Sequence, residues 1–328
     1  ESFAFEDDHK GTPCSSLGAM ADKAGGFTEA QVISRLREIF ATSDPRVEIG
    51  IGDDAAVVAG TDKRQVMTTD MAVEGVHFRT DWSSAFEIGR KVTAANAADI
   101  LAMGATPDYL LVAVALTGNE DFKWVEDLAK GIKFEADLAG LQVIGGDLSR
   151  SEKIVISISA TGHCDLPITR TGAKVGDGIY LSSLTGWSAA GLAIMESKFT
   201  SATDAYARAV GEFKSPTIDY GFDATRASAL CDISDALVIQ ATQMADSSKV
   251  AFKFDLSKIQ SCSEFVELES LSRALEIDIW KWIFAGGEDH VLLATGVDLP
   301  GILIGEVIAG AGIQNLPTGV ETSAWRHF

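Results

Sequence analysis

Apolar residues along the chain recur at two spacings, one typical of helices and one typical of strands. Residues 27–40 (FTEAQVISRLREIF) have apolar side chains at helical spacing, and Thr28 is placed to cap this helix. Over residues 47–162, short strand-like runs alternate with two long helical stretches, residues 83–105 and 120–140. The strand-like runs are VEIGIG, AAVVAG, RQVMTTDM, DYLLVAVALT, LQVIGG and KIVISISATG. Two long helices against a sheet predict one α/β layer domain.

A turn-rich stretch, residues 165–178 (DLPITRTGAKVGDG), separates this half from a second one. The second half contains the strand-like runs GIYLSS, VAFKFDL, HVLLATG and GILIGEVIA, with several helices among them. We place the boundary near residue 165, which gives domains at residues 26–165 and 166–328. Residues 1–25 follow neither spacing, so we expect a leader or disordered tail before a native start near Met20.

The bulk composition is that of a globular protein with about two domains. Of the 328 residues, 46% are apolar and 23% are charged. No apolar run approaches the roughly 18 residues needed to cross a bilayer, and the N-terminus carries acids where a signal peptide is basic. We therefore expect a cytoplasmic protein without a membrane partner. The four cysteines lie far apart without a CxxC pair, which indicates neither a zinc site nor a disulfide framework.

The charge of the chain limits its partners. The 27 basic and 47 acidic residues give a net charge of −20, which opposes binding to the phosphate backbone of DNA or RNA. Nucleic acid is therefore not an expected partner. An acidic protein can still bind a small phosphate ligand when divalent cations lie between the two sets of negative charges.

Most familiar catalytic motifs are missing from the sequence. There is no GxxxxGK[ST] phosphate loop, no HExxH and no GxSxG nucleophile elbow. Residues 50–55 fit a loose GxGxxA dinucleotide pattern, but a strand-like run follows them where a helix is needed. Two carboxylates would also face the pyrophosphate, so the sequence disfavours a Rossmann site.

Acidic residues instead recur at the ends of strand-like runs, beside glycine or a hydroxyl group. The five loops are IGIGDD (49–54), MTTD (67–70), VIGGDLS (143–149), CDISD (231–235) and FAGGED (284–289). Glycine lets the backbone approach a ligand closely, and carboxylates supply the oxygen ligands that Mg²⁺ prefers. A single loop of this kind is more often a turn with a solvated acid. Five such loops that converge would hold several Mg²⁺ ions along a triphosphate.

Single polar residues leave two interpretations open. Asp99 lies in an alanine-rich helix with Asn96 one turn earlier, so it is either exposed on the back of the helix or meets a cation. His77 follows the MTTD loop, where its imidazole either contacts a substrate phosphate or packs in a turn. His163 and His290 are expected to be structural or surface residues.

The motifs IGDDAAV, TTDMAVEGVHF, NAADILAMGATP, GGDLS, ITRTGAKVGDGIYLS, DISDAL and GGEDH occur in an order that resembles the thiamine-monophosphate kinases. Those enzymes belong to the PurM-like superfamily of aminoimidazole-ribonucleotide synthetase and selenophosphate synthetase. The resemblance covers roughly residues 27–328. It implies a two-domain PurM-like α/β fold. The N-terminal sheets of a homodimer would pair into a shared β-barrel, the C-terminal domain would form an α/β sandwich, and ATP would lie in the cleft between domains.

The resemblance also implies roles for particular residues. The family's magnesium ligands match Asp54, Thr68, Thr69, Asp70, Asp99, Asp147, Asp232 and Asp235. Its nucleotide contacts match Gly146, Asp147, Arg170 and Ser234, and its thiamine-phosphate side matches His77, Glu288 and Trp325. Among these, Asp70, Asp147 and Asp235 are expected to be catalytic. Arg170 also makes chemical sense, because a guanidinium group pairs with a phosphate through two hydrogen bonds.

Two positions depart from the family pattern. Ala236 replaces the glycine of an SDG motif, and His290 with Val291 replaces a tyrosine and an acid in GGEDYEL. The implied reaction is direct in-line transfer of the γ-phosphate of ATP to thiamine monophosphate, assisted by several Mg²⁺ ions. The alternatives are another ATP-using enzyme of the superfamily, similar to aminoimidazole-ribonucleotide synthetase, and a non-catalytic nucleotide-binding protein.

Overall fold

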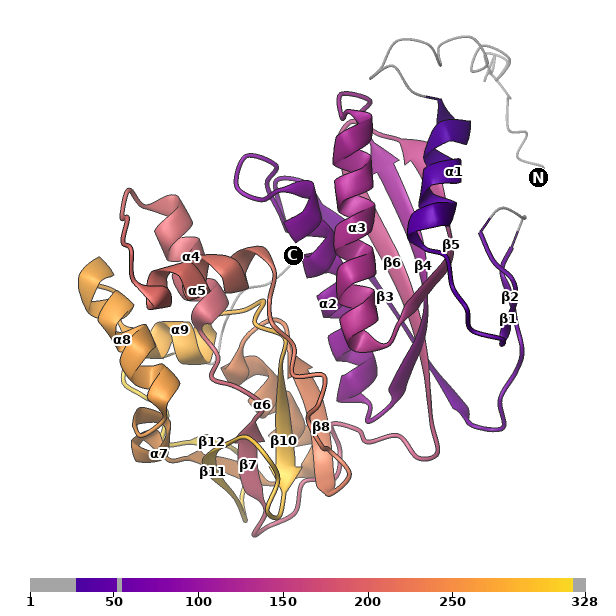
Figure 1. The fold of residues 1–328 in the computed structure, drawn as a ribbon. Helices are drawn as coiled ribbons and strands as arrows, with labels where there is room; N and C mark the ends of the chain where they lie inside the picture. Colours follow the sequence, from indigo (N-terminus) through magenta and orange to yellow (C-terminus); the bar gives the residue numbers. More distant parts are fainter. Residues whose placement is uncertain (1–27, 52–54, 321–328) are drawn as a thin grey trace, which may run out of the picture.

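The computed structural model describes residues 28–51 and 55–320, which form two parts, each built on its own sheet (Figure 1). The first sheet has the strand order β3-β6-β4-β5, and the second has the order β12-β9-β11-β7-β10-β8. The mixed α/β architecture in two parts agrees with the prediction. The predicted tail and two predicted site residues, Asp54 and Trp325, lie outside the described residues.

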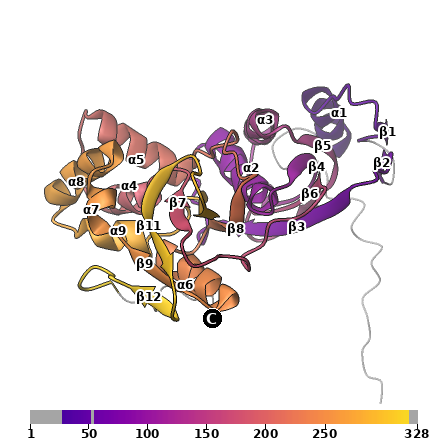
Figure 2. The ribbon, with the colours of Figure 1, turned by 90° about the horizontal axis from the view of Figure 1, so that it is seen from below.

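The first part combines a four-stranded sheet, three helices and a short hairpin. Its elements are α1 (Glu29–Ile39), β1 (Val47–Ile49), β2 (Val57–Val58), β3 (Arg64–Val73), α2 (Ala85–Ala102), β4 (Thr106–Leu116), α3 (Phe122–Ala139), β5 (Gln142–Arg150) and β6 (Val155–Cys164). Strand β6 pairs antiparallel with β3 and β4, and β5 runs parallel to β4. Figure 2 shows α2 and α3 on one face of this sheet.

Alternate residues of the first sheet face opposite sides. Along β6, Ile156 and Ile158 are buried in the core formed with α2 and α3, as strand geometry requires of every second residue. The opposite face, called the open face here, carries large exposed apolar side chains. Met67 and Met71 of β3 are 72% and 59% exposed, and Leu111 of β4 is 45% exposed. This chain alone therefore leaves an apolar surface on the sheet.

Local sequence signals explain where the helices begin and why they pack closely. The predicted cap of α1 is confirmed, because Thr28 and Gln31 form a capping box. Helices α2 and α3 meet at two glycines. A Cβ atom on Gly131 would lie 2.0 Å from the carbonyl oxygen of Phe86, and one on Gly89 would lie 2.3 Å from that of Leu128. The two backbones are therefore in direct contact.

The second part is a six-stranded sheet with six helices among the described residues. Its elements are β7 (Gly178–Leu181), α4 (Trp187–Glu196), α5 (Asp204–Lys214), β8 (Ala227–Ile233), α6 (Leu237–Ser248), β9 (Ala251–Phe254), α7 (Leu256–Gln260), α8 (Ser263–Leu275), α9 (Ile279–Ala285), β10 (Val291–Gly296), β11 (Ile302–Ile308) and β12 (Gly312–Gln314). Its core is centred on large aromatic side chains such as Phe252, Phe254 and Phe284. None of the helices in the described chain is long and apolar enough to span a membrane.

Helix α2 joins the two parts, since it packs on the first sheet and also contacts β8, β10 and α5 (Figure 1). A partly buried ion pair crosses this junction. The Nζ atom of Lys91 on α2 donates to Glu288 Oε2 at 2.9 Å and to the carbonyl oxygen of Phe213 at 3.1 Å. The face of α2 that carries Lys91 is thus held against the second part.

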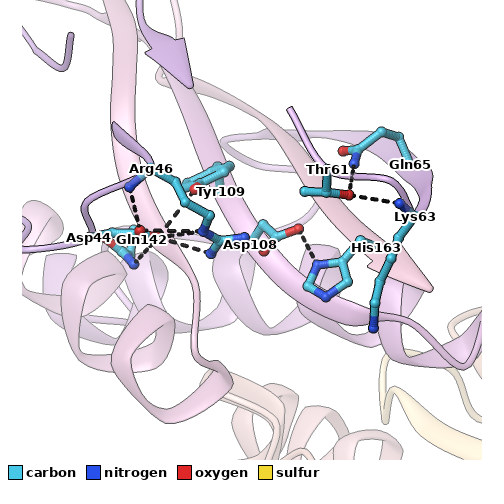
Figure 3. A network of polar contacts seen from close by, with 9 residues as sticks. All are labelled: Asp44, Arg46, Thr61, Lys63, Gln65, Asp108, Tyr109, Gln142 and His163. Carbon is cyan, nitrogen blue, oxygen red and sulfur yellow. Dashed lines mark hydrogen bonds and ion pairs between the residues drawn. The ribbon is translucent and has the colours of Figure 1, made fainter. Parts of the chain in front are cut away.

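A polar network ties the segment before β1 to the first sheet (Figure 3). Arg46 donates to Asp44 Oδ2 at 2.9 Å and to Asp108 Oδ1 at 3.0 Å. The other carboxylate oxygen of Asp108 lies 2.7 Å from His163 Nδ1. The hydrogen bonds from Arg46 hold the pKa of Asp44 at about 2. His163 is therefore a structural residue, which was one of the two alternatives.

The strand boundaries differ from the predicted loops at two sites. Asp70 and Asp147 were expected at the ends of strands, but they lie inside β3 and β5. Strand β3 continues to Val73 because it pairs with β6 over its whole length. The side each carboxylate faces is therefore set by strand alternation and not by a loop.

Candidate active site

Three of the predicted aspartates meet where the two parts join. Asp70 comes from β3, Asp99 from α2 and Asp232 from β8. Burial, together with the neighbouring carboxylates of Asp232 and Asp70, raises the pKa of Asp99 to about 6. Burial likewise raises the pKa of Asp70, and Asp232 adds to this shift. Carboxylates that repel one another in a partly buried place favour the entry of a cation.

The structure also excludes one of the two interpretations of Asp99. Its Oδ2 atom accepts a hydrogen bond of 2.6 Å from Thr68 Oγ1 on β3. The interpretation that Asp99 is exposed on the back of the helix is therefore wrong. Thr68, another predicted metal ligand, lies in the same cluster.

The CDISD and GGEDH motifs, more than fifty residues apart in the sequence, lie side by side in space. The backbone amides of Glu288 and His290 donate to the carbonyl oxygens of Ser234 at 2.6 Å and Ile233 at 2.9 Å. A Cβ atom on Gly287 would lie 2.4 Å from the carbonyl oxygen of Asp235, so this close approach requires glycine. The loop before β10 is therefore fixed against the loop that carries Ser234 and Asp235.

Two residues predicted for the acceptor side lie near the cluster. Glu288 has a backbone φ of 63°, and its carboxylate pairs with Lys91. His77 Nδ1 accepts a hydrogen bond of 3.1 Å from the backbone amide of Val73, which fixes the ring. His77 lies close enough to Asp70 to lower the pKa of that carboxylate, against the effect of burial.

Asp147 lies apart from this cluster. Pairing runs in register from Asp147 on β5 through Ala113 on β4 and Ser157 on β6 to Met71 on β3. Asp147 therefore lies on the open face, whereas Asp70, one residue before Met71, faces the other way. Three strand spacings of about 4.8 Å also separate the two edges of the sheet, roughly 14 Å in all. One chain does not bring Asp70 and Asp147 together.

Three other predicted residues also lie outside the cluster. Thr69 faces the open side, where its hydroxyl donates to the carbonyl oxygen of Ile158 at 3.0 Å. Gly146 is needed for strand pairing, because a Cβ atom there would lie 1.9 Å from the carbonyl oxygen of Val112. Arg170 is exposed and donates to the side-chain oxygen of Gln243 on α6 at 2.6 Å.

The departure at Ala236 has no backbone consequence. Its φ of −175° and ψ of 150° are extended values that any residue adopts, so the glycine of the family pattern is not required here. Ala236 is the N-cap of α6, and its backbone amide donates to the side-chain oxygen of Gln240 at 3.0 Å.

Two residues of the GGEDH motif have roles that the sequence did not distinguish. Asp289 is buried and accepts hydrogen bonds from the amides of Gly186 at 2.7 Å and Ser188 at 2.8 Å, so it fixes the start of α4. His290 is also buried, with Nδ1 at 3.5 Å from Asp232 Oδ2, so it is not a surface residue. The sequence signal that could have indicated this was the position of His290 directly after the acidic pair Glu288 and Asp289.

The residues present fit Mg²⁺ bound together with a phosphate ligand. Within residues 28–51 and 55–320, no group of three or more His, Cys, Asp or Glu side chains is arranged to hold a metal ion by itself. Mg²⁺ commonly takes only one or two carboxylates and fills its other positions with phosphate oxygens and water. The cluster of Asp70, Asp99 and Asp232 meets this requirement.

Comparisons with known proteins show which class of protein has this fold. Residues 52–164 match the family of AIR synthase related proteins, N-terminal domain. The fold is similar to thiamine-monophosphate kinase from Stenotrophomonas maltophilia, with a TM-score of 0.76 and 28% identity over 86% of this chain and 95% of that one. It is also similar to AaThiL complexed with AMPPCP and TMP, with a TM-score of 0.74 and 28% identity over 92% and 97% of the two chains. The class is thus a two-part α/β protein related to AIR synthase.

Sequence relatives narrow this class to one family. The chain is 35% identical to thiamine-monophosphate kinase from Mycobacterium tuberculosis over 81% of this chain and 83% of the relative. It is 31% identical to the enzyme from Archaeoglobus fulgidus over 92% and 98% of the two chains. The chain therefore belongs to the thiamine-monophosphate kinase family.

Proposed function

We propose that this protein transfers the γ-phosphate of ATP to thiamine monophosphate, which gives thiamine diphosphate and ADP. The observation that carries this proposal is the cluster of Asp70, Asp99 and Asp232 at the junction of the two parts, in a chain of this family. A phosphate monoester with a second pKa near 6 is largely ionised at neutral pH, so the in-line attack needs no strong general base. The protein must mainly offset the repulsion between the two phosphate groups.

In this proposal the predicted residues divide into three groups. The aspartates of the cluster with Thr68, and further Asp54 and Asp235, would hold magnesium, which would supply positive charge to the phosphoryl oxygens in the transition state. Arg170 and Ser234 contact the nucleotide, and His77, Glu288 and Trp325 contact the acceptor. At a net charge of −20 the chain should bind ATP far more weakly in EDTA than in Mg²⁺. Calorimetry that finds equal affinities would contradict the metal bridge.

We also propose a homodimer in which the first sheets pair into a barrel. Strands β3 and β5 are the edges of this sheet, and an open edge favours pairing with another chain. If β5 of one subunit lies beside β3 of the other, Asp147 of one subunit lies on the same face as Thr69 of the other and next to the strand that carries Asp70. Within one chain Asp147 is far from the cluster of Asp70, Asp99 and Asp232. In this dimer it would contribute to the cluster of the other subunit.

Mixed dimers of Asp70→Asn and Asp147→Asn subunits test this arrangement. Each homodimeric variant has two damaged sites and should be nearly inactive. If the two aspartates act from different subunits, the mixed dimer regains one intact site and about half of the wild-type activity. If both act within one chain, mixing restores nothing, and the shared site is wrong.

The activity itself is tested by incubating the full chain with ATP, Mg²⁺ and thiamine monophosphate and separating the products by chromatography. Thiamine diphosphate and ADP should form in equal amounts. Nucleotide binding without turnover would indicate a non-catalytic binding protein. Turnover of a purine precursor in place of thiamine monophosphate would indicate an enzyme similar to aminoimidazole-ribonucleotide synthetase.

A further inference from the structure

His290 places a buried ring nitrogen beside the acidic cluster. The residue is 8% exposed, and within residues 28–51 and 55–320 no atom forms a hydrogen bond with its Nδ1. The backbone fixes its position, because its amide donates to the carbonyl oxygen of Ile233 at 2.9 Å and its φ is 52°. Buried polar atoms are rarely left without a partner, so this atom calls for an explanation.

The carboxylate oxygen Asp232 Oδ2 lies 3.5 Å from His290 Nδ1. That distance is long for a hydrogen bond between a ring nitrogen and a carboxylate. It suits two ligands of one metal ion. With bonds of about 2.1 Å, adjacent ligand atoms lie about 3.0 Å apart in octahedral geometry and about 3.4 Å apart in tetrahedral geometry.

The charges around this pair also favour a cation. Asp70 and Glu288 both act electrostatically on His290, and Asp70 is itself close to Asp232. An ion held by one imidazole nitrogen and one carboxylate keeps its other positions for phosphate oxygens and water. Imidazole is a ligand for first-row transition metals, whereas Mg²⁺ prefers oxygen.

We propose that His290 Nδ1 and Asp232 Oδ2 together bind a first-row transition metal ion, for which Mn²⁺ is the probe. The inference deepens the proposed function, since the ion would lie in the same phosphate-binding cluster. The site therefore binds Mn²⁺ more tightly than Mg²⁺, and the nitrogen ligand from His290 is the reason.

Pulsed EPR of Mn²⁺ bound to the full chain tests this directly, because it detects coupling to a coordinated ¹⁴N nucleus. Tripolyphosphate is added as a phosphate ligand that contains no nitrogen. His290→Asn is the main variant, since asparagine tolerates a positive φ. His163→Asn is the matched control, because that histidine also lies beside an aspartate but in the polar network of Asp108.

The wild type and the control should show imidazole coupling, and His290→Asn should lose it. Mn²⁺ affinity should fall at least about tenfold in His290→Asn, on the scale seen when even an outer partner of a metal ligand is removed. Mg²⁺ affinity should change much less. Absence of coupling in the wild type, or coupling that survives in a folded His290→Asn variant, overturns the proposal.

A second variant keeps the test decisive if His290→Asn does not fold. The double variant His77→Asn/His163→Asn leaves His290 as the only histidine in the part of the chain that the structure describes. This double variant should retain the ¹⁴N coupling to Mn²⁺. Loss of the coupling would show that the coordinated nitrogen belongs to His77 or His163. Product formation with Mg²⁺ is measured separately. Thiamine diphosphate without nitrogen coupling overturns this inference alone, and coupling without product overturns the proposed function alone.

Discussion

Asp70, Asp99 and Asp232 are close enough to repel one another, although each comes from a different element. Such an arrangement costs folding free energy when no cation is present, because partly buried carboxylates lose hydration. Thr68 offsets part of this cost through its hydrogen bond to Asp99. A set of residues that is unfavourable for stability alone is typical of a binding site.

Replacing Asp70 with Asn removes one charge from this cluster and keeps the shape of the side chain. We expect turnover to fall by about a hundredfold or more, the scale on which one electrostatic contact to the transition state acts. Asp165→Asn is the control, because its side chain is 85% exposed. Steady-state rates at several Mg²⁺ concentrations measure both. A near-normal rate with unchanged Mg²⁺ dependence for Asp70→Asn would show that it is an ordinary strand residue.

Asp44 predicts a pH dependence of stability. Hydrogen bonds from Arg46 lower its pKa from 3.8 to about 2 in the folded protein. Because the folded pKa is below the unfolded one, its stabilising contribution is complete above about pH 4 and is lost as the pH falls towards 2. Asp44→Asn should therefore lower the free energy of unfolding at pH 6 and differ little from the wild type near pH 2. Urea unfolding measures this, and an equal deficit at both pH values would contradict it.

At the scale of elements, α2 connects the sheet, the cluster and the second part. Its alanine-rich sequence and Gly89 allow close packing on α3, and its opposite end carries Asp99 to β3. Lys91 on the same helix reaches Glu288. The helix therefore sets the distance between residues on β3 and residues on the loop before β10.

Gly131→Ala tests the contact between α2 and α3. The new methyl group would meet the carbonyl oxygen of Phe86, so we expect a loss of about 1–3 kcal/mol in unfolding free energy from overpacking. Gly211→Ala is the matched control, because nothing lies within 4 Å of its Cβ position on α5. There the substitution should stabilise by up to about 1 kcal/mol through helix propensity. Urea unfolding measures the free energy of unfolding of both variants. Equal changes in the two variants would contradict the close contact between α2 and α3.

At the scale of the whole molecule, the open face is the main unexplained surface of the single chain. Met67 and Met71 are highly exposed on a strand that is also a sheet edge. Exposed apolar patches of this kind mark interaction sites. The proposed homodimer covers this face and brings Asp147 into a shared site.

Met71→Lys should therefore disrupt the dimer, because a buried ammonium group in a sheet interface is costly. Light scattering should report a monomer, and turnover should fall with it. Leu166→Lys, at a position 75% exposed in the turn after β6, should stay dimeric. A wild-type protein that is a strict monomer at micromolar concentration and still turns over substrate would remove the shared barrel.

The sequence by itself determined the elements, the two-part α/β class and the family. Helical spacing, the cap at Thr28 and alternating strands depend on local chemistry, and the structure confirms them. The acidic loops indicated Asp70 and Asp232, and the resemblance to the family added Asp99 to the candidate site residues. Local patterns of this kind are visible without knowing which elements become neighbours.

Only the tertiary structure decided how these residues are combined. Asp70 and Asp147 belong to similar motifs, yet strand order and alternation put them at opposite edges and on opposite faces of one sheet. Pairing of β8 with β10 brought His290 to Asp232, and the position of α4 gave Asp289 a structural task. The physical reason is that local sequence specifies backbone conformation, whereas the neighbours of a side chain depend on topology and register between segments far apart in the chain.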